Sequence, residues 1–130
     1  MDTNAERVRH AFTHWEGGSS REFFEMVADD VTWRVIGTTA ISGTFSGKAS
    51  FVAGAAGKLL VRLAGPLQAT IVAVHDVGDT VVLQWEGRSH GRNGRPYEQT
   101  YCWVLGFEGG LIRNVIAYLD TALVADMFAD

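Results

Sequence analysis

The chain has few of the residue types on which several classes of protein depend. Its 130 residues include one cysteine, Cys102, so it can form neither an internal disulfide nor a thiolate metal site of its own. It has two prolines, 47% hydrophobic and 20% charged residues, a composition typical of a folded domain without a disordered tail. This length suits one domain and is too short for two, so we expect a single domain over 1–130.

Positive charge and long apolar runs are also scarce. A net charge of -4 provides no general positive field for nucleic acid, and we interpret the local cluster of Arg88, Arg92 and Arg95 as a solvated hairpin tip. No apolar run approaches the length that crosses a membrane, and the charged first residues do not resemble a secretory signal. We therefore expect a cytoplasmic protein with neither nucleic acid nor membrane as a partner.

The familiar catalytic motifs are missing as well. The sequence has no nucleophile elbow with a Ser-His-Asp order, no glycine-rich phosphate loop and no dinucleotide fingerprint. His10 and His14 lie four residues apart, but the HExxH pattern that would supply an acidic helper is not there. We interpret the two histidines as surface residues of an amphipathic helix, so the sequence predicts no metal site and no cofactor.

Helical signals open the chain. Thr3 with Glu6 is a capping-box signature, and apolar residues then recur at helical spacing, which predicts a helix over 4–16. Ser19 with Glu22 repeats the capping signature and predicts a short second helix.

A strand and a third helix follow. The β-branched and aromatic residues of 31–36 predict a strand, and the Thr, Ser and Gly content of 38–47 indicates a loop or an irregular edge. Apolar residues at helical spacing predict a third helix from near Gly47. Within it, Gly54 and Gly57 could let another backbone or a ligand approach closely.

The second half of the chain predicts an antiparallel meander. Four apolar-alternating runs are separated by turns so short that they can join only antiparallel neighbours; the runs are 66–76, 79–90, 96–107 and 111–120. Alternation gives the sheet one apolar face and one mixed face. We expect helices to cover one face and a wet cavity or a partner subunit to lie on the other, and we favour a homodimer.

This order of elements resembles the cone-shaped nuclear transport factor 2-like fold, and within it the SnoaL-like, ketosteroid-isomerase-related branch. The resemblance covers nearly the whole chain and is most recognisable in three segments: 23–33, 94–103 and 109–123. It implies an α+β fold, with N-terminal helices packed on a curved, mainly antiparallel sheet. The same cone hosts isomerases, cyclases, dehydratases, epoxide hydrolases and non-catalytic binders, so the fold alone does not select an activity.

Departures from the related enzymes limit which catalytic residues the resemblance can supply. The position of the ketosteroid-isomerase base matches Val35, and that of the buried acid beside the enolate oxygen falls near Trp103. Epoxide-hydrolase relatives place an arginine between two aspartates, for which this chain offers Glu86, Arg88 and Asp120 in a partial match.

The polyketide cyclases of the SnoaL-like branch use an aspartate near the end of the sheet, and Asp120 is the residue that resembles it. Ile116, Tyr118 and Asp120 alternate onto one face of the strand. This would place the Asp120 carboxylate beside a molecule bound inside the cone. A carboxyl group among apolar side chains can have its pKa moved toward neutrality. The alternative is structural, because Asp120 could instead cap a final short helix.

We therefore predict a cofactor-independent acid/base enzyme of the isomerase, cyclase or dehydratase type. Its substrate would be a small hydrophobic, cyclic or polyketide-like molecule. The expected catalytic residues are Asp120, Arg88 and His90, and the expected substrate-binding residues are Trp33, Tyr101, Trp103, Tyr118 and Glu86. A non-catalytic binding or assembly module and an epoxide hydrolase are the alternatives.

Overall fold

The computed structural model describes residues 2–129. Within them the elements follow the order α1 (Asn4–Glu16), α2 (Arg21–Glu25), β1 (Val27–Val35), β2 (Gly43–Ser46), α3 (Lys48–Phe51), the π-helical turn η1 (Val52–Ala56), α4 (Gly57–Leu60), β3 (Gln68–Val77), β4 (Thr80–His90), β5 (Pro96–Glu108), β6 (Leu111–Leu119) and α5 (Thr121–Met127). No helix among these residues is both long enough and apolar enough to cross a membrane.

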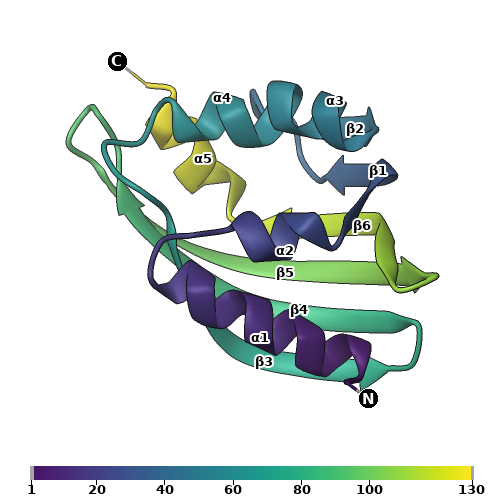
Figure 1. Cartoon of the computed structure of the whole chain (residues 1–130). Coiled ribbons are helices and arrows are strands. Elements are labelled where there is room, and N and C mark those ends of the chain that lie inside the picture. Colours follow the sequence, from purple (N-terminus) through teal and green to yellow (C-terminus); the bar gives the residue numbers. More distant parts are fainter. Residues whose placement is uncertain (1, 130) are drawn as a thin grey trace.

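Six strands form one curved sheet in the order β2-β1-β6-β5-β4-β3 (Figure 1). The predicted meander is confirmed, since β3 to β6 pair with their chain neighbours in antiparallel fashion. The pairing of β1 with β6 is parallel and brings Trp33 opposite Val115. The short edge strand β2 lies within the segment predicted as a loop or irregular edge.

Helices pack against one face of this sheet. Phe12 of α1 meets Trp85 of β4 with ring centroids 5.4 Å apart, and Phe23 of α2 meets Trp103 of β5 at 5.5 Å. Alternation along β5 puts one set of residues on this inner face, and all of them are buried: Tyr97, Gln99, Tyr101, Trp103, Leu105 and Phe107. The predicted α+β class, with helices on a curved, mainly antiparallel sheet, is confirmed.

The helix starts agree with the sequence in one case and differ in the other. Thr3 caps α1, because its hydroxyl accepts a hydrogen bond from the Glu6 backbone N–H at 3.1 Å. The predicted Ser19–Glu22 capping box is wrong. Ser20 is the N-cap of α2 and makes no side-chain cap bond, whereas the carboxylate of Glu22 is turned toward α1.

The predicted third helix runs from α3 through η1 to α4, with a π-helical turn in its middle. Gly54, in that turn, meets the ring of Phe45 from β2. A Cβ added at Gly54 would overlap Cε1 of Phe45 and lie 2.9 Å from its Cδ1. The close approach at Gly54 is thus made by an aromatic side chain and not by the backbone or ligand expected from the sequence.

Candidate functional site

A pocket of about 250 Å³ lies between the helices and the inner face of the sheet. The helical side of its wall comes from Trp15, Phe24, Phe51, Ala55, Ala56 and Leu59, and the sheet side from Trp33, Trp85, Tyr101, Trp103, Ala117 and Leu119. Within residues 2–129, no Asp, Glu, His, Lys or Arg lines it. Leu60 and Pro66 line the pocket and are also exposed, so they mark the end at which it reaches the surface.

The wall of the pocket is built from packed aromatic rings. Trp33 stacks on Phe51 with centroids 3.9 Å apart, and Trp85 stacks on Tyr101 at 4.1 Å. Trp103 stands edge-to-face between the two stacks, 5.1 Å from Trp33 and 4.8 Å from Trp85. Offset stacks and edge-to-face pairs are the arrangements that aromatic rings prefer, so this wall presents a well-defined apolar surface.

A short chain of hydrogen bonds leads from the end of β6 to this wall. The Gln99 amide nitrogen donates to the Asp120 carbonyl at 2.9 Å and to the Tyr97 hydroxyl at 3.4 Å, while its oxygen accepts from the Thr100 and Asp120 backbone N–H groups. The Tyr97 and Tyr101 hydroxyl oxygens are 2.6 Å apart. Either hydroxyl can be the donor of this bond; when Tyr97 donates to Tyr101, the proton of Tyr101 is free for a ligand.

Both hydroxyls remain protonated at ordinary pH. Burial raises the pKa of Tyr101 well above its usual range, and the adjacent Tyr97 raises it further. Burial also raises the pKa of Tyr97, although hydrogen bonds with Tyr101 and Gln99 partly oppose this shift. Tyr101 is therefore a neutral hydrogen-bond donor rather than a phenolate.

Three of the indoles in the wall carry further donors. The indole N–H groups of Trp33, Trp85 and Trp103 are buried, and none has a hydrogen-bond acceptor within residues 2–129. Trp15 differs, because its indole N–H donates to the Leu67 carbonyl at 3.0 Å. A buried donor without an acceptor costs about 1–3 kcal/mol.

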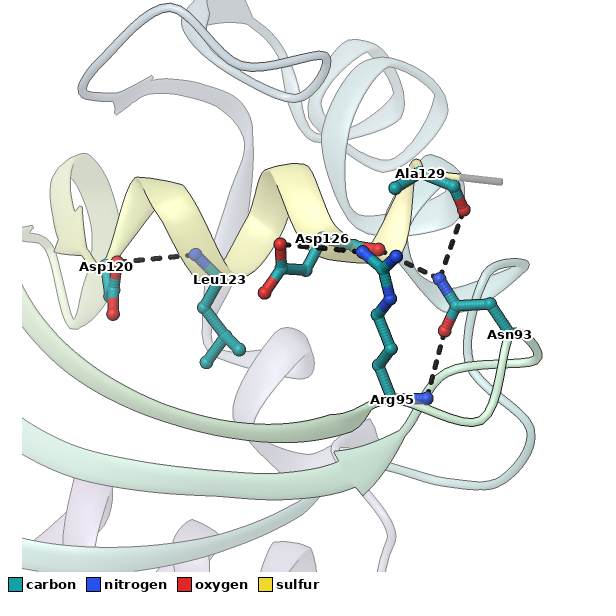
Figure 2. Close-up of polar contacts among 6 residues, drawn as sticks. All are labelled: Asn93, Arg95, Asp120, Leu123, Asp126 and Ala129. Atoms are coloured by element: carbon teal, nitrogen blue, oxygen red, sulfur yellow. Dashed lines mark hydrogen bonds and ion pairs between the residues drawn. The ribbon is translucent and has the colours of Figure 1, made fainter.

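Asp120 does not line the pocket. Its side chain is exposed and caps α5, where Oδ1 accepts from the backbone N–H of Ala122 at 3.1 Å. It also accepts from the backbone N–H of Leu123 at 3.3 Å, the bond that Figure 2 shows. Only its backbone contacts the hydrogen-bond chain, through Gln99. The structural alternative considered for this residue, a helix cap, is the role its geometry displays.

The other predicted polar site residues also lie away from the pocket. Glu86, Arg88 and His90 are exposed on β4, on the opposite face from Trp85, and Arg88 donates to the Thr70 hydroxyl at 2.9 Å. Tyr118 is 46% exposed on β6. The reason is the period of two along a strand, which sends these residues to the outer face while their neighbours point inward.

The structure thus brings together three of the predicted residues, Trp33, Tyr101 and Trp103. Gln99, which sequence reasoning did not assign to the site, completes the polar chain together with Tyr97. A signal for Gln99 was present in the alternation of β5, because it is a polar residue on an otherwise apolar face. Within residues 2–129 it is the one buried polar side chain.

Helices over one face of a curved sheet, with an apolar pocket between them, define the nuclear transport factor 2-like class. A family profile described as a SnoaL-like domain matches residues 8–115. The chain therefore belongs to the SnoaL-like domain family, as its sequence resemblance predicted. A search of curated proteins finds no match.

Solved structures support the same fold. An NTF2-like protein from Burkholderia thailandensis superposes with a TM-score of 0.82 at 21% identity, covering 100% of both chains. A protein with a ketosteroid isomerase-like fold from Catenulispora acidiphila, solved in complex with trimethylamine, gives 0.72 at 19% identity over 94% of this chain and 91% of its own. TerC, co-crystallised with polyporic acid, gives 0.75 at 17% identity over 95% and 96%.

Proposed function

We propose that this protein binds a small molecule of one or two rings that carries an acceptor oxygen. The ring system would occupy the aromatic pocket, and the oxygen would accept a hydrogen bond from the Tyr101 hydroxyl. The observation that carries this proposal is the hydroxyl-bearing Tyr101 at the wall of a pocket that is otherwise almost wholly apolar. Such a combination is typical of small-molecule sites, in which apolar surface gives affinity and a few polar groups fix orientation.

The volume of the pocket limits the size of the ligand. An apolar cavity of about 150 Å³ holds benzene, and pockets for drug-sized ligands occupy about 300–1,000 Å³. A pocket of about 250 Å³ lies between these values and fits one or two rings better than a fused four-ring skeleton. The stacked indoles favour a flat molecule.

The donors in the wall favour an acceptor on that molecule. Tyr101 keeps its proton because its pKa is raised, and the indoles of Trp33, Trp85 and Trp103 have no acceptor within residues 2–129. A ketone, quinone or similar oxygen would satisfy a donor that is otherwise unpaired. The small molecules held by TerC and by the Catenulispora protein are consistent with a binding role for this fold.

Binding has more support than acid/base catalysis. No carboxylate or imidazole among residues 2–129 lines the pocket, and the one titratable side chain in its wall, Tyr101, has a pKa raised well above neutrality. Epoxide hydrolysis would need a water between two carboxylates, and both candidates, Glu86 and Asp120, are exposed away from the pocket. We therefore favour the non-catalytic alternative over the acid/base enzyme expected from the sequence.

The test uses a matched pair of probes and a matched pair of variants. Acetylnaphthalene, a two-ring ketone, is titrated into the protein by calorimetry beside ethylnaphthalene, which lacks the oxygen. Ala56 lines the pocket and Ala53 is exposed one turn earlier, so Ala56→Leu fills the pocket while Ala53→Leu does not. We expect Ala56→Leu to weaken binding of the ketone at least about tenfold, the loss of about 1.4 kcal/mol.

Two results would count against the proposal. One is a failure of the wild-type protein to bind one- and two-ring ketones in a wider thermal-shift panel. The other is equal binding by the Ala53→Leu and Ala56→Leu variants, because this would place the ligand outside the pocket.

A further inference from the structure

We infer that His10, His14 and Glu22 form a binding site for one divalent first-row transition-metal ion, with Zn²⁺ as the representative cation, and that the ion joins α1 to α2. The three side chains are the members of a cluster whose ligand atoms all lie within 4.8 Å of one another. This site is on the surface, separate from the aromatic pocket, and does not depend on the proposed ligand.

The two histidines come from one face of α1. They are four residues apart, so they lie one turn apart on the same side of the helix, with ring centroids at 5.5 Å. The acidic partner comes from the next helix, eight residues after His14. The sequence offered the histidine pair without a local acid, and the fold supplies that acid from α2.

The distances fit a shared cation. Nε2 of His14 is 2.9 Å from Oε2 of Glu22, and Nε2 of His10 is 3.4 Å from Oε1. With metal–ligand bonds of about 2.0–2.2 Å, ligand atoms lie about 2.9 Å apart at octahedral angles and about 3.3 Å apart at tetrahedral ones. The observed separations span these values, so small side-chain adjustments would let the three atoms face one ion.

The donor set selects the class of cation. Imidazole nitrogen with one carboxylate suits Zn²⁺, Cu²⁺, Ni²⁺ and Co²⁺, whereas Ca²⁺ and Mg²⁺ prefer oxygen ligands throughout. Three protein ligands leave at least one coordination position for water. The side chains of His10 and His14 are 69% and 55% exposed, which gives an ion direct access from solvent.

The charged groups around the cluster do not oppose the binding of a cation. Asp2, Arg7, Arg21 and Glu25 line the same surface depression, two acids and two bases. Arg21 pairs with Glu25 at 3.5 Å, and Arg7 donates to the Gly110 carbonyl at 2.8 Å, so both guanidinium groups have other partners. The metal ion would therefore compete mainly with protons for the ligand atoms, since imidazole must be neutral to coordinate.

The consequence for the fold is a link across the α1–α2 turn. α2 has five residues and its N-cap Ser20 makes no side-chain bond, so an ion would add a link to the helix beyond the packing of Phe23 on Trp103. Trp15 follows His14, and Phe24 lies two residues after Glu22; both line the aromatic pocket. An ion bound to both helices would fix this side of the pocket wall.

The site is tested with ZnCl₂ on protein from which any affinity tag has been removed. We expect one Zn²⁺ per chain by calorimetry, with weaker binding in acid, and an increase in the melting temperature on adding Zn²⁺. The variants His10→Gln, His14→Gln and Glu22→Gln alter exposed or half-exposed side chains, so they should fold. Each is expected to lower the affinity by on the order of tenfold or more, and the His10→Gln/His14→Gln double variant should lose the thermal shift.

Matched controls use the same residue types elsewhere. His75→Gln, His90→Gln, Glu25→Gln and Cys102→Ser should leave both the affinity and the thermal shift unchanged. The inference is overturned if the wild-type protein shows no saturable binding of one Zn²⁺, or if the His10→Gln/His14→Gln variant binds as tightly as the wild type. Loss of binding in a control variant but not in the cluster variants would also overturn it.

Discussion

The hydroxyl oxygens of Tyr97 and Tyr101 lie 2.6 Å apart, and of these two residues it is Tyr101 that lines the pocket. Gln99 anchors the pair, because its amide is fully used between Tyr97 and the backbone of Thr100 and Asp120. These hydrogen bonds link the end of β6 to the tyrosine pair. Tyr101, the member of the pair at the pocket wall, is the group that a bound oxygen would meet.

Replacing Tyr101 with Phe removes this donor and keeps the ring that stacks on Trp85. A neutral hydrogen bond contributes about 0.5–1.5 kcal/mol, so we expect the ketone probe to bind roughly 2–12 times more weakly. The hydrocarbon probe should bind as before, since it has no oxygen to lose. Calorimetric titration of both probes measures the difference.

Tyr97→Phe is the control for that experiment. Tyr97 does not line the pocket, and without it Tyr101 can still donate to a ligand. We expect a smaller loss of ketone affinity than for Tyr101→Phe. An equal loss of ketone and hydrocarbon binding in Tyr101→Phe would mean that the hydroxyl shapes the pocket rather than contacting the ligand.

The same pair makes stability sensitive to alkaline pH. Burial raises the pKa of both hydroxyls above the ordinary value of 10.0, so they keep their protons when the unfolded chain releases them. The folded state then binds more protons than the unfolded state. Their contribution to stability is complete below pH 10 and is lost as the pH rises beyond it, at up to about 1.4 kcal/mol per pH unit for each tyrosine.

Urea unfolding across this range provides the measurement, with the Tyr97→Phe/Tyr101→Phe variant as reference. Other groups titrate in the same range, so the informative quantity is the difference between the two proteins. We expect the free energy of unfolding to fall more steeply with pH in the wild type. Parallel curves would show that the hydroxyls titrate alike in the folded and unfolded chains.

Asp120 should behave as a helix cap. Asp120→Ala removes the acceptor for Ala122 and Leu123 and is expected to lower the free energy of unfolding by about 0.5–2 kcal/mol. Asp120→Asn keeps a capping oxygen and loses only the interaction of the charge with the helix dipole, so it should cost about 0.5 kcal/mol. Chemical denaturation compares the two. If Asn is as costly as Ala, the charge of Asp120 rather than its capping bond stabilises α5.

Neither Asp120 variant should alter binding of the ketone probe, because the side chain lies outside the pocket. This distinguishes the cap from the acid/base role that the sequence suggested. A large loss of binding in Asp120→Asn, with stability unchanged, would restore a functional role for the carboxylate.

The position of Asp120 shows what strand alternation can and cannot predict. Alternation correctly separated Ile116 and Tyr118 from Val115 and Ala117, but a period of two yields two faces without saying which is inside. Both faces of these strands carry apolar groups, and the choice depends on where α1 and α2 pack. The predicted catalytic residues Arg88 and His90 came from the outer face, as did Tyr118 and Glu86, whereas Trp33, Tyr101 and Trp103 came from the inner one.

Most of the fold could be predicted from local sequence patterns. The meander follows from alternation and short turns, and α1 from a capping box and helical spacing, all of which lie close together in the sequence. The parallel pairing of β1 with β6 joins residues about eighty positions apart, as with Trp33 and Val115, and no local signal encodes it. The approach of Glu22 to His10 and His14 likewise depends on how two helices pack.

The contact between Gly54 and Phe45 provides a test of the π-helical turn beside the pocket. In an isolated helix, alanine is more favourable than glycine by about 1 kcal/mol. Here the added Cβ would overlap the ring of Phe45, and overpacking costs about 1–3 kcal/mol. We therefore expect Gly54→Ala to destabilise the wild-type protein and to stabilise the Phe45→Ala variant.

A double-mutant cycle measured by urea unfolding gives the interaction energy between the two positions, which should be at least about 1 kcal/mol. Gly65→Ala is the control, because a Cβ there would meet nothing within 4 Å. It should give the same small change in both backgrounds. If Gly54→Ala also has the same effect with and without the Phe45 ring, close packing against β2 is not the reason for glycine at this position, and the backbone of the π-helical turn itself must require it.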